Sequence, residues 1–303
     1  MLSLSAARIA NATHFTSSKS HPVALFVGGT SGIGEAAARA MARYTKGDSH
    51  IIICGRNREA ADNIISSFPE HPQSQYEFVA CDASLMRNVK TVTSDLLSRL
   101  QKLNYIVLSP GILTMRGRTE TEEGIDQKLA LHYYARWKFI HDLLPLLRKA
   151  KDAGEDAKVL TVLGAGRGGE IDLEDLGLKK NYTLAKAAGA AETYNDLMIE
   201  EFSSREPDLT FTHITPGVVL TPLLTPKQWY LKPFSFMLST ALRPFVFSAD
   251  ECAEYLLQSL LYDKSGAFMR GTKAQLLYAP ASISGRDEAR QKLWDHTLRS
   301  VDV

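Results

Sequence analysis

The sequence predicts a single α/β domain with a doubly wound, parallel sheet of about seven strands and helices on both faces. Two observations lead to this fold class. Short apolar segments with strand character alternate along the chain with longer segments of helical spacing, which is typical of a parallel sheet covered by helices. The second of these strand segments, SHIIIC at residues 49–54, is dominated by apolar residues, as expected for a strand buried on both faces. No internal repeat or low-complexity tract interrupts this pattern, so residues 1–303 are expected to form one domain.

The composition limits the function classes. The chain is 45% hydrophobic and 23% charged, as in ordinary globular proteins. Its net charge of +1 gives no reason to expect nucleic acid or an anionic membrane as the main partner. The three cysteines are far apart and odd in number, which favours a reducing, cytoplasmic location over a disulfide framework. The histidines form no close pair with metal-ligand spacing, so no metal site is predicted.

Residues 1–20 have an unusual composition. They are rich in Ser, Thr and Ala and contain no Asp or Glu, as organelle transit peptides do. They carry few basic residues and lack the long apolar core of a secretory signal. We therefore favour a short N-terminal arm packed on the domain, with an organelle location as the alternative.

The elements follow from the same patterns. Strands are expected at residues 23–27, 49–54, 76–81, 105–109, 158–163, 209–214 and 274–278. Helices are expected at residues 35–44, 59–68, 86–103, 126–150, 181–202, 249–262 and 286–298. Pro145 is expected to kink or end the fourth of these helices, and Ser248 to cap the sixth.

The most informative motif is the glycine-rich turn after the first strand, where residues 23–34 read VALFVGGTSGIG. A turn of this kind between a strand and a helix holds a dinucleotide pyrophosphate in Rossmann-type folds. Its glycines let the backbone approach the phosphates, and the helix N-terminus directs free N–H groups at them. The residues expected to contact the cofactor here are Gly28, Thr30, Ser31, Gly32, Ile33 and Gly34.

The end of the second strand indicates which cofactor binds. An NAD site usually places a carboxylate there for the ribose hydroxyls, whereas a 2′-phosphate needs a cation. This chain has Gly55, Arg56 and Asn57 and no acid. Arg56 can form a forked, charge-assisted contact to a phosphate, and Asn57 adjoins it. NADP(H) is therefore the predicted cofactor, and the alternative is that Arg56 is only a solvated loop residue.

The segment YTLAK at residues 182–186 carries candidate acid–base chemistry. Tyr182 and Lys186 are four residues apart on the expected fifth helix and would share one face. A free tyrosine, with a pKa near 10, is a poor base at neutral pH. A nearby ammonium stabilises the phenolate and makes proton exchange with an alcohol or ketone feasible. The pair is weak evidence alone and gains weight from its place after the fifth strand.

Together these motifs resemble the short-chain dehydrogenase/reductase superfamily over nearly the whole chain. The glycine turn, Asp82 after the third strand, the Tyr182/Lys186 pair and PGVVLT at residues 216–221 follow the family's order and spacing. The local sequence of residues 108–140 resembles that of a divergent fungal branch of the superfamily, whose members are often tied to secondary metabolism. The resemblance implies that Asp82 lies near the adenine and that Lys186 also binds the nicotinamide ribose. It adds these residues to the cofactor site: Ala83, Gly111, Pro216, Gly217, Val219 and Thr221.

The chain also departs from the family. The Asn-Asn-Ala-Gly turn after the fourth strand is replaced by residues 108–111, LSPG. The active-site asparagine aligns with His132, which could serve in a proton relay or simply pack in the helix. The active-site serine is missing, and Leu163 or Gly164 stands in its place. Backbone N–H groups around Gly164 could partly replace it in binding the substrate. Thr161 is a remote substitute and is better suited to a structural role inside its strand.

Residues 221–247 are expected to determine substrate specificity. They are rich in aromatic residues, among them Trp229 and Tyr230, which favours a lid over a lipophilic substrate. Membrane contact and subunit packing are alternatives, but prolines and charges interrupt the run, so no spanning helix is expected. The small residues at 185–191 could form a homodimer contact or pack on the chain's own sheet.

We therefore predict an NADP(H)-dependent oxidoreductase, a ketoreductase or alcohol dehydrogenase, for a lipophilic and even polycyclic ketone or secondary alcohol. Tyr182 would exchange the proton, Lys186 would lower the pKa of Tyr182, and His132 would relay protons. Because the active-site serine is missing, the alternative is a non-redox enzyme, namely an isomerase, dehydratase or cyclase. A third reading is an NADP-binding protein that catalyses nothing.

Overall fold

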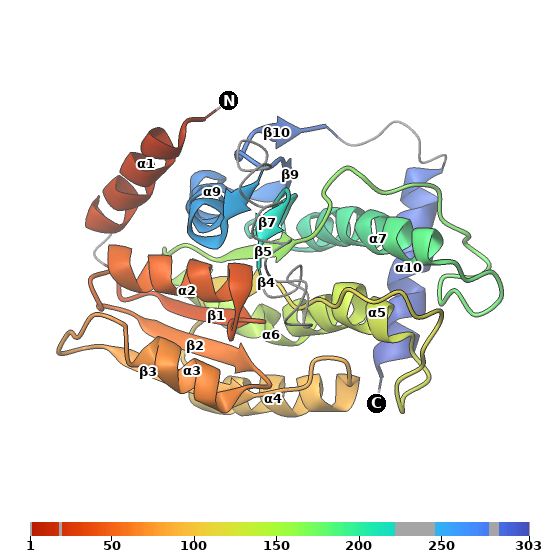
Figure 1. The fold of residues 1–303 in the computed structure, drawn as a ribbon, viewed down its shortest axis with the longest axis horizontal. Coiled ribbons are helices and arrows are strands. Elements are labelled where there is room, and N and C mark those ends of the chain that lie inside the picture. Colours follow the sequence, from red (N-terminus) through yellow and green to blue (C-terminus); the bar gives the residue numbers. More distant parts are fainter. Residues whose placement is uncertain (1, 18–19, 222–245, 279–284, 303) are drawn as a thin grey trace, which may run out of the picture.

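In the computed structural model of the protein, the structure describes residues 2–17, 20–221, 246–278 and 285–302 (Figure 1). Their core is an eight-stranded sheet in the order β10-β9-β6-β5-β4-β1-β2-β3. Its parallel strands are β1 Val23–Val27, β2 His50–Gly55, β3 Gln75–Ala80, β4 Tyr105–Leu108, β5 Lys158–Val162, β6 Thr210–Ile214 and β9 Gly266–Arg270. The strand β10 Leu276–Leu277 pairs antiparallel with β9. The predicted α/β class with about seven parallel strands is confirmed.

The prediction of the last strand is wrong in detail. The seventh parallel strand is β9, and the predicted strand at 274–278 shrinks to the short antiparallel β10. The segment GAFMR of β9 begins with a glycine and ends with an arginine, so its apolar run is only three residues long and was not recognised as a strand. A separate two-stranded ladder joins β7 Val219–Leu220 to β8 Phe247–Ser248.

Helices cover both faces of the sheet (Figure 1). On one face lie α2 Gly32–Tyr44, α3 Arg58–Ile65 and α9 Ala249–Tyr262, which share one apolar core. On the other lie α4 Met86–Arg99, α6 Ala135–Asp152, α7 Leu184–Arg205 and α10 Arg286–Val301. Before α6 come the short helix α5 Gln127–Leu129 and the π-helical segment η1 Ala130–Tyr134.

Two helix predictions need correction. Pro145 does not end its helix, because α6 continues to Asp152. The fifth predicted helix begins at Leu184 rather than at residue 181, since Thr183 is its N-cap and accepts a hydrogen bond from the backbone N–H of Lys186. Tyr182 therefore precedes the helix, and it does not share a helical face with Lys186.

The N-terminal segment forms the helix α1 Leu4–Ser17. Its residues Ala7 and Asn11 are fully buried, and Asn11 is hydrogen-bonded to Glu254 of α9. Among the described residues, no helix is both long and apolar enough to cross a membrane. The same part of the chain holds no cluster of three or more His, Cys, Asp or Glu suited to a metal ion.

Candidate active site

A cleft of 350 Å³ lies where β3, β2, β1 and β4 end. In the strand order, β1 stands between β2 and β4, so this is the point where the chain changes direction across the sheet and where ligands bind in open α/β sheets. The predicted cofactor residues that line the cleft are Gly28, Thr30, Ser31, Gly32, Ile33, Gly34, Arg56, Asp82, Ala83, Gly111 and Thr221. Residues that were not predicted also line it: Val27, Cys54, Gly55, Cys81, Ser109, Pro110 and Leu131.

The glycine turn packs too closely for side chains. Gly28 has a φ of 80°, a conformation that favours glycine. A Cβ on Gly34 would lie 2.5 Å from Ser109 Oγ and 2.9 Å from the carbonyl carbon of Gly28. The helix α2 begins at Gly32, and its N-cap Ser31 makes no side-chain capping bond. The first backbone N–H groups of α2 therefore lie beside the cleft without a hydrogen bond from the N-cap side chain. N–H groups in this position suit a pyrophosphate.

The side chains at the end of β2 and β3 fit the other half of a dinucleotide. Arg56 is exposed at the cleft and forms no ion pair with a described residue. Asp82, across from it after β3, accepts hydrogen bonds from the backbone N–H and the hydroxyl of Ser84. Asn57 does not line the cleft: its side chain caps α3 by accepting from the N–H of Ala60 at 3.0 Å. The side chain of Asn57 therefore has a capping role, and its predicted contact with the cofactor stays a prediction.

His132, on the π-helical segment η1, does not line the cleft but lies next to Gly111, which does. Its Nε2 accepts a hydrogen bond from the N–H of Ile112 at 3.1 Å and lies 3.2 Å from the position of a Cβ on Gly111. Burial, together with the charges of Arg136 and Lys128, lowers the pKa of His132 to about 3. The imidazole is therefore neutral, with its proton on Nδ1. Isolated π-helical turns occur frequently at functional sites.

A buried polar network supports His132 from behind. Asn195 of α7 donates to the backbone carbonyl of His132 at 2.7 Å and accepts from the hydroxyl of Thr161 at 2.8 Å. Arg136 donates to the same hydroxyl at 2.7 Å and to the carbonyl of Val162 at 2.9 Å. Thr161 is fully buried, so its role is structural. Asn195 was not predicted from the sequence, because its partners lie on other elements.

Tyr182 and Lys186 lie elsewhere. The hydroxyl of Tyr182 is buried and has no hydrogen-bond partner among the described residues. The ammonium of Lys128, not that of Lys186, lies over its ring, 5.3 Å from the centroid. Lys186 is exposed and lines a separate cavity of 250 Å³ together with Glu170 and Asp172. Neither Tyr182 nor Lys186 lines the cleft with the glycine turn.

Gly164, two residues after β5, has an unpredicted neighbour. A Cβ on Gly164 would lie 2.5 Å from Cδ and 2.9 Å from Cγ of Glu192. Glu192 comes from α7 and is partly buried. Burial raises the pKa of its carboxyl group, and the charge of Arg167 opposes this effect. Position 164 therefore has no room for a serine side chain unless Glu192 moves.

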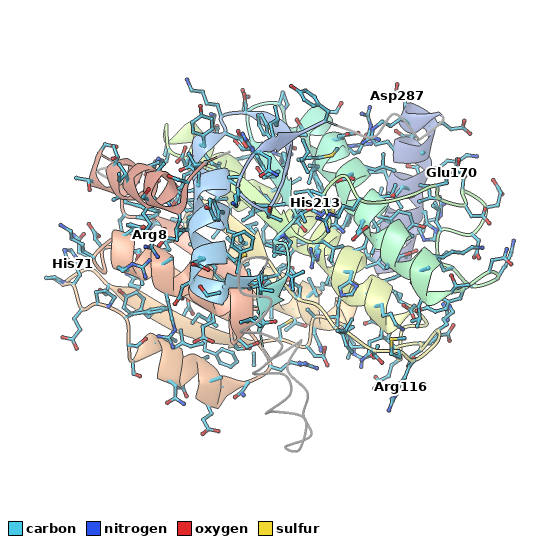
Figure 2. All side chains as sticks on the ribbon, turned by 45° about the horizontal axis from the view of Figure 1, so that its top comes forward. Arg8, His71, Arg116, Glu170, His213 and Asp287 are labelled. Atoms are coloured by element: carbon cyan, nitrogen blue, oxygen red, sulfur yellow. The ribbon has the colours of Figure 1, made fainter. Side chains whose placement is uncertain are left out.

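Beside Glu192, a second carboxylate is fully paired. Asp196 lies 2.6 Å from Nδ1 of His213 and also accepts from the N–H of Gly166. Both side chains of the pair are buried, and Figure 2 shows His213 in the interior of the molecule. Asp196 therefore stabilises the loop after β5 through these bonds. Glu192, in contrast, makes no hydrogen bond or ion pair within the described part of the chain.

The segment after β6 only partly reaches the cleft. Thr221 lines it, and Val219 is buried in the β7–β8 ladder. Gly217 has a φ of 76°, and its Cβ would lie 2.8 Å from Cγ2 of Thr272; Pro216 precedes this tight turn. Neither Pro216 nor Gly217 lines the cleft. The predicted substrate residues Trp229 and Tyr230 lie outside the described residues.

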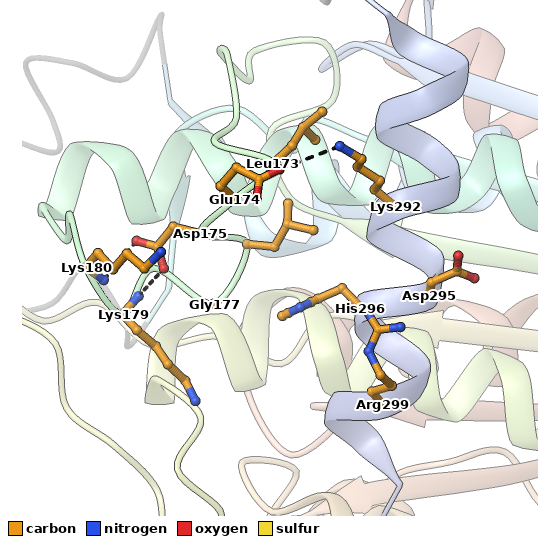
Figure 3. A pocket seen from close by; sticks show the side chains of 11 residues that line it. Leu173, Glu174, Asp175, Gly177, Lys179, Lys180, Lys292, Asp295, His296 and Arg299 are labelled. Atoms are coloured by element: carbon orange, nitrogen blue, oxygen red, sulfur yellow. Dashed lines mark hydrogen bonds and ion pairs between the residues drawn. The ribbon is translucent and has the colours of Figure 1, made fainter.

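A larger hollow of 480 Å³ lies between the loop at residues 173–180 and α10 (Figure 3). Its polar groups mostly hold the loop in place. Asp175 accepts from the backbone N–H groups of Lys179 and Lys180, and Lys292 of α10 lies 3.6 Å from Glu174. None of the predicted site residues lines this hollow, so it is not the candidate active site.

Comparisons with known proteins show which family the chain resembles and agree with its fold. A family profile described as short chain dehydrogenase matches residues 22–229. The "Oxidoreductase AN1596" of Emericella nidulans is 36% identical over 92% of both chains. The "Oxidoreductase andH" of Emericella variicolor is 37% identical over 74% of this chain and 65% of that protein. The structure of an NADPH-bound carbonyl reductase from chicken fatty liver has a TM-score of 0.63 at 16% identity, covering 85% of this chain and 98% of that chain.

Proposed function

Because the chain belongs to the short-chain dehydrogenase/reductase family, we propose that it is an NADP(H)-dependent oxidoreductase. We propose further that it acts as a ketoreductase or alcohol dehydrogenase on a lipophilic, even polycyclic, ketone or secondary alcohol of secondary metabolism. The family profile spans the glycine turn and the segment at 182–186. The two fungal relatives carry the name oxidoreductase, which supports the reaction class.

The observation that carries the proposal is the cleft itself. Its glycine turn and the N-terminus of α2 suit a pyrophosphate. On one side, Arg56 suits a 2′-phosphate and Asp82 with Ala83 suits the adenosine half. On the other side, Gly111 and Thr221 adjoin the place expected for the nicotinamide. The structurally similar carbonyl reductase has NADPH bound, which supports the same cofactor.

When bound, NADPH supplies a hydride to the carbonyl carbon and leaves as NADP⁺, while the carbonyl oxygen takes a proton from the protein. The chain's own residues must therefore hold the nicotinamide half near Gly111, orient the carbonyl group and deliver the proton. Tyr182, Lys186 and His132 are the residues that the family resemblance predicts for this proton exchange.

The substrate class rests on the sequence of residues 221–247, most of which lie outside the described residues. Aromatic side chains in that segment suit a lipophilic substrate. A homodimer through α7 would use Ala185 and Ala188, which are exposed. The other alanines of that run, Ala187, Ala190 and Ala191, are buried in the chain's own core.

The test mixes the purified full chain with NADPH and a panel of lipophilic ketones. The absorbance of NADPH measures its consumption, and the product alcohol is quantified in the same reactions. We expect one NADPH oxidised for each alcohol formed, and NADPH preferred over NADH. Tight NADPH binding without turnover on any ketone, or on any alcohol with NADP⁺, would contradict the proposal and favour a binding protein.

A second candidate is a non-redox isomerase, dehydratase or cyclase. The observation that favours it is the carboxyl group of Glu192 at Gly164, where the family has a serine, because a carboxyl group can also move protons without a hydride. Product formed without NADPH consumption would select this candidate.

A further inference from the structure

Arg136 of α6 is a buried cation without an acidic partner. The residue is only 1% exposed, and no Asp or Glu in the described part of the chain forms an ion pair with it or opposes the effect of burial on its pKa. The remaining segments of the sequence contain no Asp or Glu. Burial lowers the pKa of Arg136 to about 9, so the guanidinium is still charged at neutral pH. Because a buried charge is normally paired, this cation needs another explanation.

The guanidinium group is fixed behind the wall of the cleft. Its Nη2 donates to the carbonyl oxygen of Pro110 at 2.8 Å, and its Nε donates to that of Leu131 at 3.3 Å. Both of these residues line the cleft with the glycine turn. Its Nη1 donates to Thr161 at 2.7 Å and to Val162 at 2.9 Å, at the end of β5. All four acceptors are neutral, so these bonds fix the position of the charge without cancelling it.

This charge lies close to the part of the cleft that is expected to hold the nicotinamide. The carbonyl oxygen of Pro110 is within about 3 Å of Cα of Gly111 by peptide geometry. A ligand in contact with Gly111, which lines the cleft, therefore lies within about 10 Å of the guanidinium. His132, next to Gly111, responds to the same charge, because its pKa is lowered first by burial and then by Arg136.

Charge distinguishes the two forms of the cofactor. The nicotinamide ring is neutral in NADPH and carries one positive charge in NADP⁺. A cation about 10 Å away, at an effective dielectric constant near 20, weakens the binding of a second unit positive charge roughly 10- to 20-fold. Lys128 also acts on His132, but it lies 3.9 Å from Asp126. Of these two cations, only Arg136 lacks an acid.

We propose that Arg136 is a specificity-determining residue that makes the cleft bind NADPH more tightly than NADP⁺. Its buried positive charge disfavours the oxidised ring and leaves the binding of the reduced ring unaffected. Weak binding of NADP⁺ lets the oxidised cofactor leave after each turnover, so the site suits carbonyl reduction better than alcohol oxidation. This inference rests on the proposed function and gives its preferred direction.

The experiment measures the dissociation constants of NADPH and NADP⁺ by tryptophan fluorescence titration at pH 7. We expect the wild type to bind NADPH at least about tenfold more tightly than NADP⁺. Arg136→Gln keeps N–H donors but removes the charge, so this ratio should fall about tenfold. Arg136→Lys keeps the charge and should keep the ratio within about threefold. The matched control is Lys138→Gln, because Lys138 is buried on the same helix but lies 3.3 Å from Asp142; its ratio should equal that of the wild type.

The ratio separates electrostatics from a structural role, since a distorted cleft weakens the binding of both nucleotides together. Thr161→Asp is a second way to remove the net charge. It leaves Arg136 in place and puts a carboxylate where Nη1 now meets a hydroxyl at 2.7 Å, so the ratio should fall even if Arg136→Gln does not fold.

Equal affinity of the wild type for NADPH and NADP⁺, or a ratio that neither of these charge changes lowers, would overturn the inference and leave the proposed function intact. A wild-type protein that binds neither nucleotide would instead overturn the proposed function.

Discussion

Asn11 and Glu254 are hydrogen-bonded across 243 residues of sequence. Nδ2 of Asn11 donates to the backbone carbonyl of Glu254 at 2.9 Å and to its Oε2 at 3.0 Å. The same buried carboxylate accepts from Tyr44 at 2.7 Å and from Arg43 at 2.8 Å. These contacts tie α1 to α9 and α2, so α1 is part of the packed domain in this structure.

Replacing Asn11 should therefore destabilise the whole domain. We expect Asn11→Ala to lower the free energy of unfolding by about 1–3 kcal/mol, because a buried carboxylate loses a donor. The exposed Ile9 on the same helix provides the control, and Ile9→Ala should change stability by less than about 0.5 kcal/mol. Urea unfolding of both variants measures the difference, and equal midpoints for Asn11→Ala and the wild type would show that α1 contributes little.

The glycine turn should not tolerate a methyl group. In Gly34→Ala, the new Cβ would meet Ser109 Oγ at 2.5 Å and the carbonyl carbon of Gly28 at 2.9 Å, so β4 and the turn must separate. We expect a stability loss of about 1–3 kcal/mol and loss of NADPH binding. Gly117 has no atom within 4 Å of its Cβ position, and Gly117→Ala should behave as the wild type does. Thermal unfolding and NADPH titration of the two variants test this contrast.

Arg56 should set the preference for NADPH over NADH. Loss of its charge-assisted bonds to a 2′-phosphate is worth about 1.5–3 kcal/mol, which corresponds to roughly a 10- to 150-fold weaker NADPH affinity in Arg56→Ala. NADH affinity should stay within about twofold. The matched control is Arg58→Ala, because Arg58 packs over the ring of Phe78 and does not line the cleft. Tryptophan fluorescence titrations of the wild type and both variants with NADPH and with NADH give the six constants. An unchanged NADPH constant in Arg56→Ala would remove Arg56 from the site.

The parts of the molecule that the sequence predicted correctly are encoded locally. An apolar run followed by glycines and alanines predicts β1, the turn and α2, and the family resemblance built on these motifs is confirmed by the family profile. The capping role of Ser248 is confirmed by its reciprocal bonds with Glu251. In each case the interacting residues are close together in the chain, so their spacing carries the information.

The parts that the sequence did not predict depend on competition between two local structures or on contacts between residues far apart in the sequence. The start of α7 depends on whether Thr183 caps the helix or continues it, and capping prevails. The contact between Gly164 and Glu192 depends on how the intervening loop folds, which residue spacing alone does not indicate. The network of Asn195 with Thr161 and His132 joins three elements. Contacts between candidate site residues on different elements therefore could not be predicted without the structure.

The last prediction concerns pH and His132. Its pKa is lowered from 6.5 to about 3, first by burial and then by Arg136 and Lys128. The unfolded chain therefore binds a proton at His132 at a higher pH than the folded protein does. The stabilisation is complete above about pH 6.5 and is lost as the pH falls toward 3.

His132→Asn removes this titration, since asparagine does not ionise. We expect the wild type to lose about 2 kcal/mol relative to the variant between pH 7 and pH 5, because each pH unit below 6.5 corresponds to about 1.4 kcal/mol. This window lies above the lowered pKa values of Glu77 and Asp156, both about 2, so those carboxylates stay ionised in the folded protein. Urea unfolding at pH 7, 6 and 5 measures the two slopes. Parallel slopes would mean that His132 is solvated and free to take up a proton in the folded state, and a neutral relay at the cleft wall would then have no support.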